Sequence, residues 1–219
     1  MQEVEGALLR DRRPVFVQLA TAAAPEGPER LRYWHELGRQ AAERLGVAQV
    51  VVPVEDRAGA ESDELAALVE GAGLVYLSGG NPTFLARTLV DSRVWRAIEA
   101  AWLGGAALAG CSAGAMALAG RVADPFNVEH PLEPGLGAVP QVRVIPHFDR
   151  FARRMPAANL RRLSDSPPGV TVVGIDEDTA LVGGVEEWEV RGRQSVWVIR
   201  EGERTEHPSG SRVLLPRAV

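Results

Sequence analysis

The sequence predicts an α/β fold of three layers, with a mostly parallel central sheet flanked by helices and β-hairpins at its C-terminal edge. Short apolar runs alternate with longer helical patterns through the first half of the chain, and such alternation is typical of parallel strands joined by right-handed crossovers. The runs are almost continuously apolar, as in strands covered on both faces. With 219 residues, 46% of them hydrophobic, the chain is large enough to bury a substantial core. We therefore expect one domain over residues 1–219.

The spacing of apolar residues predicts the elements of the first half. Leu31, Trp34, Leu37, Ala41 and Leu45 recur at helical intervals and indicate a helix over residues 29–45. Further helical patterns cover residues 61–71 and 82–103, the latter as one or two helices. Strands are expected at residues 14–19, 47–52, 73–77 and 105–111.

The second half of the chain has a different pattern. A strand is expected at residues 142–145 and an arginine-rich helix at residues 150–163. Four short apolar segments separated by glycine-containing turns then predict hairpins. These strands are expected at residues 170–175, 180–185, 187–190 and 195–199, and they would make the sheet mixed.

Composition and charge exclude several classes of function. A net charge of −5 without a dense basic patch argues against nucleic acid or an anionic membrane as the main partner. Cys111 is the only cysteine, so an intramolecular disulfide and a cysteine-based metal cluster are excluded. No His-x-x-x-His pattern or cluster of metal ligands is present, so we expect no metal and no cofactor. The acidic start of the chain and the lack of a run of roughly 18 apolar residues predict a soluble, cytoplasmic protein.

The most informative segment is the apolar run that ends in Gly110-Cys111-Ser112-Ala113-Gly114. A Gly-x-Ser-x-Gly pattern between a strand and a helix is typical of a nucleophile elbow, in which glycines allow the chain to cross itself closely around a strained serine. The serine hydroxyl would then lie at a helix N-terminus, where backbone N–H groups favour a developing oxyanion. The sequence therefore predicts that Ser112 is a nucleophile.

A serine nucleophile needs a base and an acid that orients the base. His147 directly follows the expected strand at residues 142–145, at the sheet edge where ligands of open parallel sheets bind, and it is the best candidate for the base. His35 lies in a helical pattern, and His130 and His207 lie in loop or tail segments. Spacing alone does not choose the acid, which could be any of five carboxylates: Asp124, Glu129, Glu133, Asp176 or Glu177.

Four motifs in order resemble a known family. They are Gly79-Gly80-Asn81, Gly110 to Ala115, Pro146-His147-Phe148 and Gly174 to Leu181. In this order they resemble the motifs of the serine peptidases that include dipeptidase E and cyanophycinase, and the resemblance spans about residues 14–200. This resemblance implies a class I glutamine amidotransferase-like fold in which serine replaces the usual cysteine at the elbow. It also implies that Ser112 is the nucleophile and His147 the base, with the N–H groups of Gly80 and Ala113 as the oxyanion hole.

The resemblance also bears on the acid. The segment beginning at Glu129 is similar to the region in which the dipeptidase carries its acidic residue, so Glu129 is the preferred acid, although glutamate stands there where aspartate is usual. Glu177 is the second candidate. Asp176 and Glu177 could instead hold the turn and support the site from behind.

Cys111 precedes the elbow serine and should point to the opposite side of the strand, where a small thiol packs well. We expect a packing role for it.

An aspartyl group of a substrate carries a carboxylate, which arginine binds well through paired hydrogen bonds. Arg153 or Arg154 is predicted to bind this carboxylate, with Asn81 as a further substrate contact.

The leading functional hypothesis is a serine exopeptidase that acts on short peptides, with Asp-x dipeptides as the predicted substrates. Carboxypeptidase action and cleavage of β-aspartyl-arginine are alternatives on the same machinery, and a non-catalytic binding module of the same fold is an alternative from another class. An open sheet edge is also compatible with a homodimer.

Overall fold

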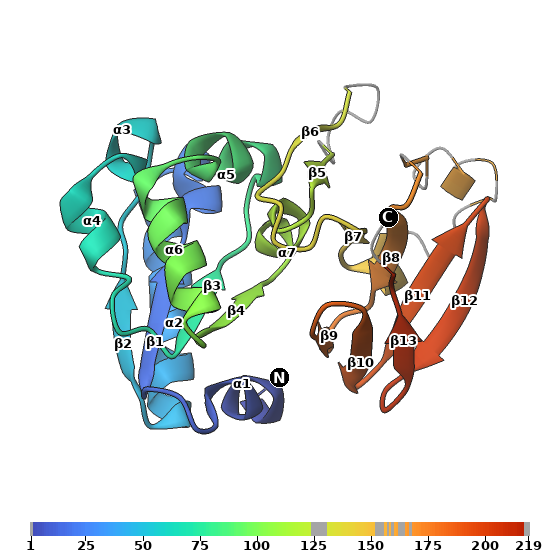
Figure 1. Ribbon diagram of the computed structural model, residues 1–219, viewed down its shortest axis with the longest axis horizontal. Coiled ribbons are helices and arrows are strands. Elements are labelled where there is room, and N and C mark those ends of the chain that lie inside the picture. Colours follow the sequence, from blue (N-terminus) through green and yellow to red (C-terminus); the bar gives the residue numbers. More distant parts are fainter. Residues whose placement is uncertain are drawn as a thin grey trace.

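The fold class expected from the sequence is confirmed by the structure, a computed structural model that describes residues 2–123, 131–151, 156, 158, 160, 161, 165, 166 and 168–216. A parallel sheet with helices around it occupies the N-terminal half, and antiparallel strands make up most of the C-terminal half (Figure 1).

The parallel sheet has the strand order β2-β1-β3-β4. Its register pairs Val17 of the central strand with Val50 on one side and Val75 on the other, and Val75 with Leu108. The strands are β1 (Val15–Leu19), β2 (Ala48–Val51), β3 (Leu74–Leu77) and β4 (Ala107–Gly110). All four expected strands are therefore present, each slightly shorter than its apolar run.

Both faces of this sheet carry apolar side chains, because successive residues of a strand point to opposite sides. Val17 packs in one buried cluster with Leu85 and Ile98. Phe16 packs on the other face with Ala42. The sheet is thus the middle of three layers, as the uninterrupted apolar runs predict.

The helices cover these faces and connect the strands. They are α1 (Gln2–Leu9), the 3₁₀ helix η1 (Thr21–Glu26), α2 (Pro28–Leu45), α3 (Arg57–Ala60), α4 (Asp63–Ala67), α5 (Pro82–Leu89), α6 (Arg93–Leu103), α7 (Ala113–Ala117) and α8 (Phe148–Phe151). The pattern over residues 82–103 forms two helices, because Asp91 adopts a positive φ of 56° and Ser92 caps the second helix. The helix expected at residues 61–71 is shorter, since the α4 span begins after its Ser62 cap and ends at Ala67. Within the described part of the chain, no helix is long and apolar enough to span a membrane.

The C-terminal strands form sheets of their own rather than extending the parallel sheet. One has the order β12-β11-β8-β7, with β7 and β8 parallel and the other pairs antiparallel. Its strands are β7 (Val142–Ile145), β8 (Thr171–Ile175), β11 (Ser195–Arg200) and β12 (Glu203–Pro208); a second sheet contains β9 (Thr179–Gly183), β10 (Glu187–Gly192) and β13 (Arg212–Leu214), and a small ladder joins β5 (Arg121–Val122) to β6 (Glu133–Pro134). The expected hairpin strands are confirmed, but helix α7 lies between β4 and β7 and separates the sheets (Figure 1).

A buried polar network ties β1 to the neighbouring elements. Gln18 is 2% exposed, and its Nε2 donates to the carbonyl oxygen of Trp34 at 2.8 Å and to Ser78 Oγ at 3.1 Å. Its Oε1 accepts from Gln49 Nε2 at 2.9 Å. A Cβ at Gly38 would overlap the Gln18 carboxamide, so this approach of α2 requires glycine. The network fixes Ser78, the residue that precedes the Gly79-Gly80 turn.

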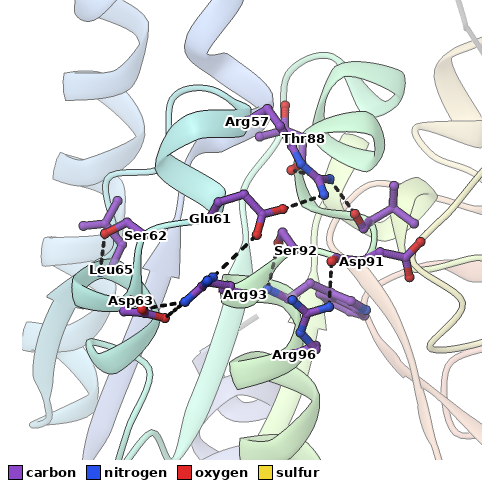
Figure 2. A network of polar contacts seen from close by, with 12 residues as sticks. Arg57, Glu61, Ser62, Asp63, Leu65, Thr88, Asp91, Ser92, Arg93 and Arg96 are labelled. Atoms are coloured by element: carbon purple, nitrogen blue, oxygen red, sulfur yellow. Dashed lines mark hydrogen bonds and ion pairs between the residues drawn. The ribbon is translucent and has the colours of Figure 1, made fainter.

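The far end of α5 is held by a second polar network, drawn in Figure 2. Arg57 Nη1 donates to the carbonyl oxygens of Val90 at 2.5 Å and Thr88 at 3.4 Å, and Arg57 Nη2 donates to Glu61 at 2.6 Å. A cation at the C-terminus of a helix satisfies carbonyl groups that have no partner within the helix and complements the helix dipole. Arg57 therefore fastens the end of α5 to α3.

We expect Arg57→Met to lower the free energy of unfolding by about 1 kcal/mol, because the lost hydrogen bonds are half-exposed. That corresponds to a fall in Tm of about 2–4 °C for a chain of this size. Differential scanning calorimetry would measure it. Arg96→Met is the matched control. Arg96 donates to the carbonyl of Asp91, which lies beyond the end of α5, at 2.9 Å, so its loss should lower the free energy of unfolding by less. An equal loss in both variants would contradict the capping role.

Candidate active site

Ser112 stands at the turn between β4 and α7 in a strained backbone conformation, with φ 49° and ψ −113°. The flanking glycines make the turn possible: a Cβ at Gly110 would come within 2.7 Å of the Ala115 nitrogen, and one at Gly114 within 2.9 Å of Leu77 Cβ. Non-glycine residues adopt this region rarely, and the surrounding structure must hold them there. The segment therefore has the geometry of a nucleophile elbow.

Three side chains form a continuous chain of hydrogen bonds. His147 Nε2 lies 3.0 Å from Ser112 Oγ, and His147 Nδ1 lies 2.7 Å from Glu177 Oε1. When the proton of the imidazole is on Nδ1, it is donated to the carboxylate, and Nε2 is left to accept the serine proton. The arrangement can thus activate the serine hydroxyl.

The parallel pairing of β7 with β8 explains why the base and the carboxylate meet. Ile145 pairs with Gly174, so the two strands end side by side. His147 follows the end of β7 and Glu177 follows the end of β8. This placement is the one that the ends of adjacent parallel strands provide.

The carboxylate beside His147 therefore belongs to Glu177, the second candidate from the sequence. The preferred candidate, Glu129, lies outside the described residues, as does Asp124. Glu133 is described and accepts from Arg87 Nε at 2.5 Å. The sequence carries part of the signal for Glu177, since residues 142–145 and 170–175 are consecutive expected strands. Their parallel pairing, which places residues 147 and 177 at one edge, is a property of the folded chain.

The backbone of Glu177 is anchored by hydrogen bonds at both its N–H and its carbonyl group. Its N–H donates to Asp149 Oδ1 at 3.0 Å, and its carbonyl oxygen accepts from Thr179 Oγ1 and from Gln194 Nε2, each at 3.1 Å. Arg150 Nε lies 3.2 Å from the same Glu177 oxygen that contacts His147, in an exposed ion pair. None of Asp149, Thr179 and Gln194 was singled out from the sequence as a site residue.

Asp176, predicted as a supporting residue, is 4% exposed. Its carboxylate accepts from Trp197 Nε1 at 3.1 Å and from the Ser195 N–H at 3.3 Å. These partners belong to β11, so Asp176 joins the end of β8 to the neighbouring strand.

The glycine turn after β3 passes directly beside the elbow. A Cβ at Gly79 would lie 2.8 Å from Trp34 Cζ2 and 3.3 Å from Ser112 Cβ, and Gly80 has a φ of 139°. The N–H groups of Asn81 and Gly114 are already donated to the carbonyl oxygens of Ala22 and Cys111. The N–H groups of Gly80 and Ala113 thus stay the candidates for an oxyanion hole.

The predicted substrate-binding residues are only partly placed. Asn81 Oδ1 accepts from the Phe84 N–H and from Thr83 Oγ1, each at 2.9 Å, so this side chain caps helix α5. Arg153 and Arg154 lie outside the described residues. In the ranges that the structure describes, no group of three or more His, Cys, Asp and Glu side chains is arranged to hold a metal ion.

The thiol of Cys111, the residue before Ser112, contacts the side chain of Tyr76 in β3. Burial raises the pKa of its thiol, although hydrogen bonds with the Tyr76 side chain and the Gly79 backbone oppose the shift. A thiol with a raised pKa is protonated near neutral pH and is a poor nucleophile. This environment agrees with a packing role.

An α/β fold whose elbow serine is hydrogen-bonded to a histidine, itself bonded to a carboxylate, defines the serine hydrolase class of site. The model of peptidase family S51 matches residues 22–190, and the chain belongs to this family.

Relatives and solved structures agree with this assignment. The cyanophycinase of Trichormus variabilis is 30% identical over 191 residues, which cover 82% of this chain and 60% of the relative. That of Synechococcus elongatus is 32% identical over 181 residues, covering 77% and 53%. The chain thus spans little more than half the length of these relatives. The crystal structure of a peptidase from an acI-B1 Actinobacterium has a TM-score of 0.88 and 38% identity over 97% of this chain and 90% of that one. A putative peptidase E protein from Listeria monocytogenes, with a TM-score of 0.60 and 16% identity over 95% and 93% of the two chains, shares the fold.

The lowered pKa of Asp149 predicts that part of the free energy of unfolding depends on pH in the acid range. Partial burial would raise this pKa, but hydrogen bonds from the Glu177 N–H and the Gln194 amide outweigh it and hold the pKa below the ordinary value of an aspartate. A carboxyl group with a lowered pKa stabilises the folded chain above its unfolded pKa, and the contribution is lost as the pH falls through the folded pKa. We expect the difference in unfolding free energy between the unsubstituted protein and Asp149→Asn to be constant above about pH 5 and to shrink below it. Urea unfolding at a series of pH values would measure it, and a difference that does not change with pH would contradict the assignment.

Proposed function

We propose that this member of family S51 is a serine peptidase that hydrolyses short peptides through an acyl-enzyme. The observation that carries the proposal is the hydrogen-bonded chain from Ser112 through His147 to Glu177. A serine with no chemical role would not need a strained backbone conformation and a base at 3.0 Å.

In the proposed reaction, Ser112 Oγ attacks the carbonyl carbon of the scissile peptide while His147 Nε2 takes the hydroxyl proton. The N–H groups of Gly80 and Ala113 stabilise the oxyanion. The carbon–nitrogen bond then breaks, and His147 gives its proton to the departing amine. Water then attacks the ester carbonyl carbon while His147 takes one of its protons. The bond between this carbon and Ser112 Oγ breaks, Oγ takes the proton from His147, and the carboxylic acid product leaves.

Glu177, rather than Glu129, is proposed as the acid of the triad. Its carboxylate would hold the imidazole in the tautomer that accepts the serine proton and would stabilise the imidazolium that forms. The 2.7 Å contact with Nδ1 supports this role.

For the substrate, we propose short peptides with an aspartyl residue on the acyl side, with Asp-x dipeptides as the leading case. The 30–32% identity to cyanophycinases supports a second candidate, an isopeptide bond formed by the aspartyl side chain with arginine. Arg153 and Arg154 stay the proposed carboxylate-binding residues for either substrate.

The test is release of free amino acid from Asp-x, x-Asp, β-Asp-Arg and neutral dipeptides, with EDTA present. We expect Ser112→Ala to reduce turnover of the preferred peptide by about 10⁴-fold or more, because the nucleophile is lost. Cys111→Ala is the matched control and should retain most activity. Fluorophosphonate labelling of Ser112 would separate an active hydrolase from a binding module. Equal loss in both variants, with folding intact, would overturn the assignment of the nucleophile.

A second comparison decides between the two candidate acids. Glu177→Gln should lower kcat by about 10²- to 10⁴-fold, because an amide does not stabilise the imidazolium and favours the wrong tautomer. Glu129→Gln should leave kcat within a factor of about two. Steady-state kinetics on the same peptide would measure both. The reverse order of effects would restore Glu129 as the acid.

A further inference from the structure

The carboxylate of Glu177 is not held in place by burial. Its side chain is 33% exposed, and one of its oxygens contacts both His147 and the exposed Arg150. A glutamate side chain has three rotatable bonds, so its carboxylate can take many positions unless its backbone and its partners limit them. Its backbone, in contrast, is bound at both the N–H and the carbonyl group by three half-buried side chains.

Asp149 and Gln194 are the residues that connect these anchors. Asp149 Oδ1 accepts from the Glu177 N–H at 3.0 Å, and Asp149 Oδ2 faces Gln194 Nε2 at 3.4 Å. The same Gln194 nitrogen donates to the Glu177 carbonyl oxygen at 3.1 Å. The backbone N–H of Gln194 is donated to Thr179 Oγ1, which fixes the glutamine relative to the turn. The three side chains thus close a ring of hydrogen bonds around one peptide segment.

We propose that Asp149 and Gln194 are positioning residues that hold Glu177 against His147, an inference that rests on the proposed serine peptidase function. Asp149 comes two residues after His147, in the short helix α8 that follows β7, so the same short segment carries the base and the anchor for the acid. Any displacement of this segment moves His147 and Glu177 together, and the 2.7 Å contact between them is kept.

The chemistry of Asp149 suits this task. An ionised carboxylate is an acceptor with two oxygens and can serve the Glu177 N–H and the Gln194 amide at once. The hydrogen bonds that it accepts outweigh its partial burial and hold its pKa below the ordinary value, so it is ionised at neutral pH. Alignment matters because an error of about 1 Å in a catalytic constellation costs on the order of 10²-fold in rate.

The experiment compares Asp149→Ala, Asp149→Asn and Gln194→Ala. Asp149→Ala removes the acceptor for the Glu177 N–H, and we expect kcat to fall by about 10- to 100-fold with KM nearly unchanged. Asp149→Asn keeps an acceptor oxygen and should restore kcat to within a few-fold of the unsubstituted protein. Gln194→Ala should have a smaller effect, and combining it with Asp149→Ala should cost less than the sum of the two. Asp178→Asn is the matched control: this neighbouring acid has an exposed side chain paired with Arg193, and asparagine tolerates its φ of 53°.

Two further measurements separate positioning from loss of folding and from failure of the proposed function. Fluorophosphonate titration gives the fraction of folded, reactive enzyme, to which each kcat is normalised. The downfield proton resonance of the His147 Nδ1–H reports its hydrogen bond to Glu177 without any turnover. We expect this resonance to persist in Asp149→Asn and Asp178→Asn and to weaken in Asp149→Ala.

Unchanged kcat and an unchanged resonance in folded Asp149→Ala would overturn the proposal, as would an equal loss in Asp149→Asn and Asp149→Ala. If the unsubstituted protein cleaves no peptide and Ser112 is unreactive, the peptidase function fails. The imidazole resonance would then still decide whether Asp149 holds Glu177 in place.

Discussion

The fixed spacing between the two sheets is the constraint on which the site depends, because the hydrogen bond between Ser112 and His147 connects groups from sheets that share no ladder within the described residues. Ser112 follows β4 of the parallel sheet, whereas His147 and Glu177 follow β7 and β8 of the second sheet. The serine and its base are therefore correctly spaced only if the two sheets are held in fixed relation. Helix α7 provides that relation: Met116 packs in the core of the first sheet, and Ala115 packs against the core of the second.

Much of the architecture could be predicted from periodicity, since the four parallel strands and the elbow are encoded locally. The division into separate sheets could not, because it depends on where α7 packs, and a five-residue helix of small side chains has little periodic signal. The polar network around Gln18 is a feature that the sequence analysis does not predict. A glutamine inside an apolar strand is a visible anomaly, but its partners at Trp34, Ser78 and Gln49 come from distant parts of the chain.

The residues of the candidate site also differ in how far the sequence alone predicts them. Ser112 and His147 could be predicted from the sequence because each follows a recognisable strand with a distinctive local pattern. The acid could not be predicted in this way, since five carboxylates were candidates and the similarity of one segment to the family favoured Glu129. The choice of Glu177 follows from the register of β7 and β8, which is a tertiary property. The anchoring role of Asp149 was equally hidden, because its partners are the backbone of Glu177 and the side chain of Gln194.

The small size of α7 has a consequence for how this scaffold can diversify. Gly114 sits so close to β3 that an added methyl group would come within 2.9 Å of Leu77 Cβ, and Ala113 and Ala117 are almost fully buried. A larger side chain at any of these three positions would press α7 away from its neighbours and disturb the spacing between Ser112 and His147. Substitutions that alter which ligands the site accepts would therefore have to lie outside these three positions, because the place of α7 between the two sheets requires small residues there.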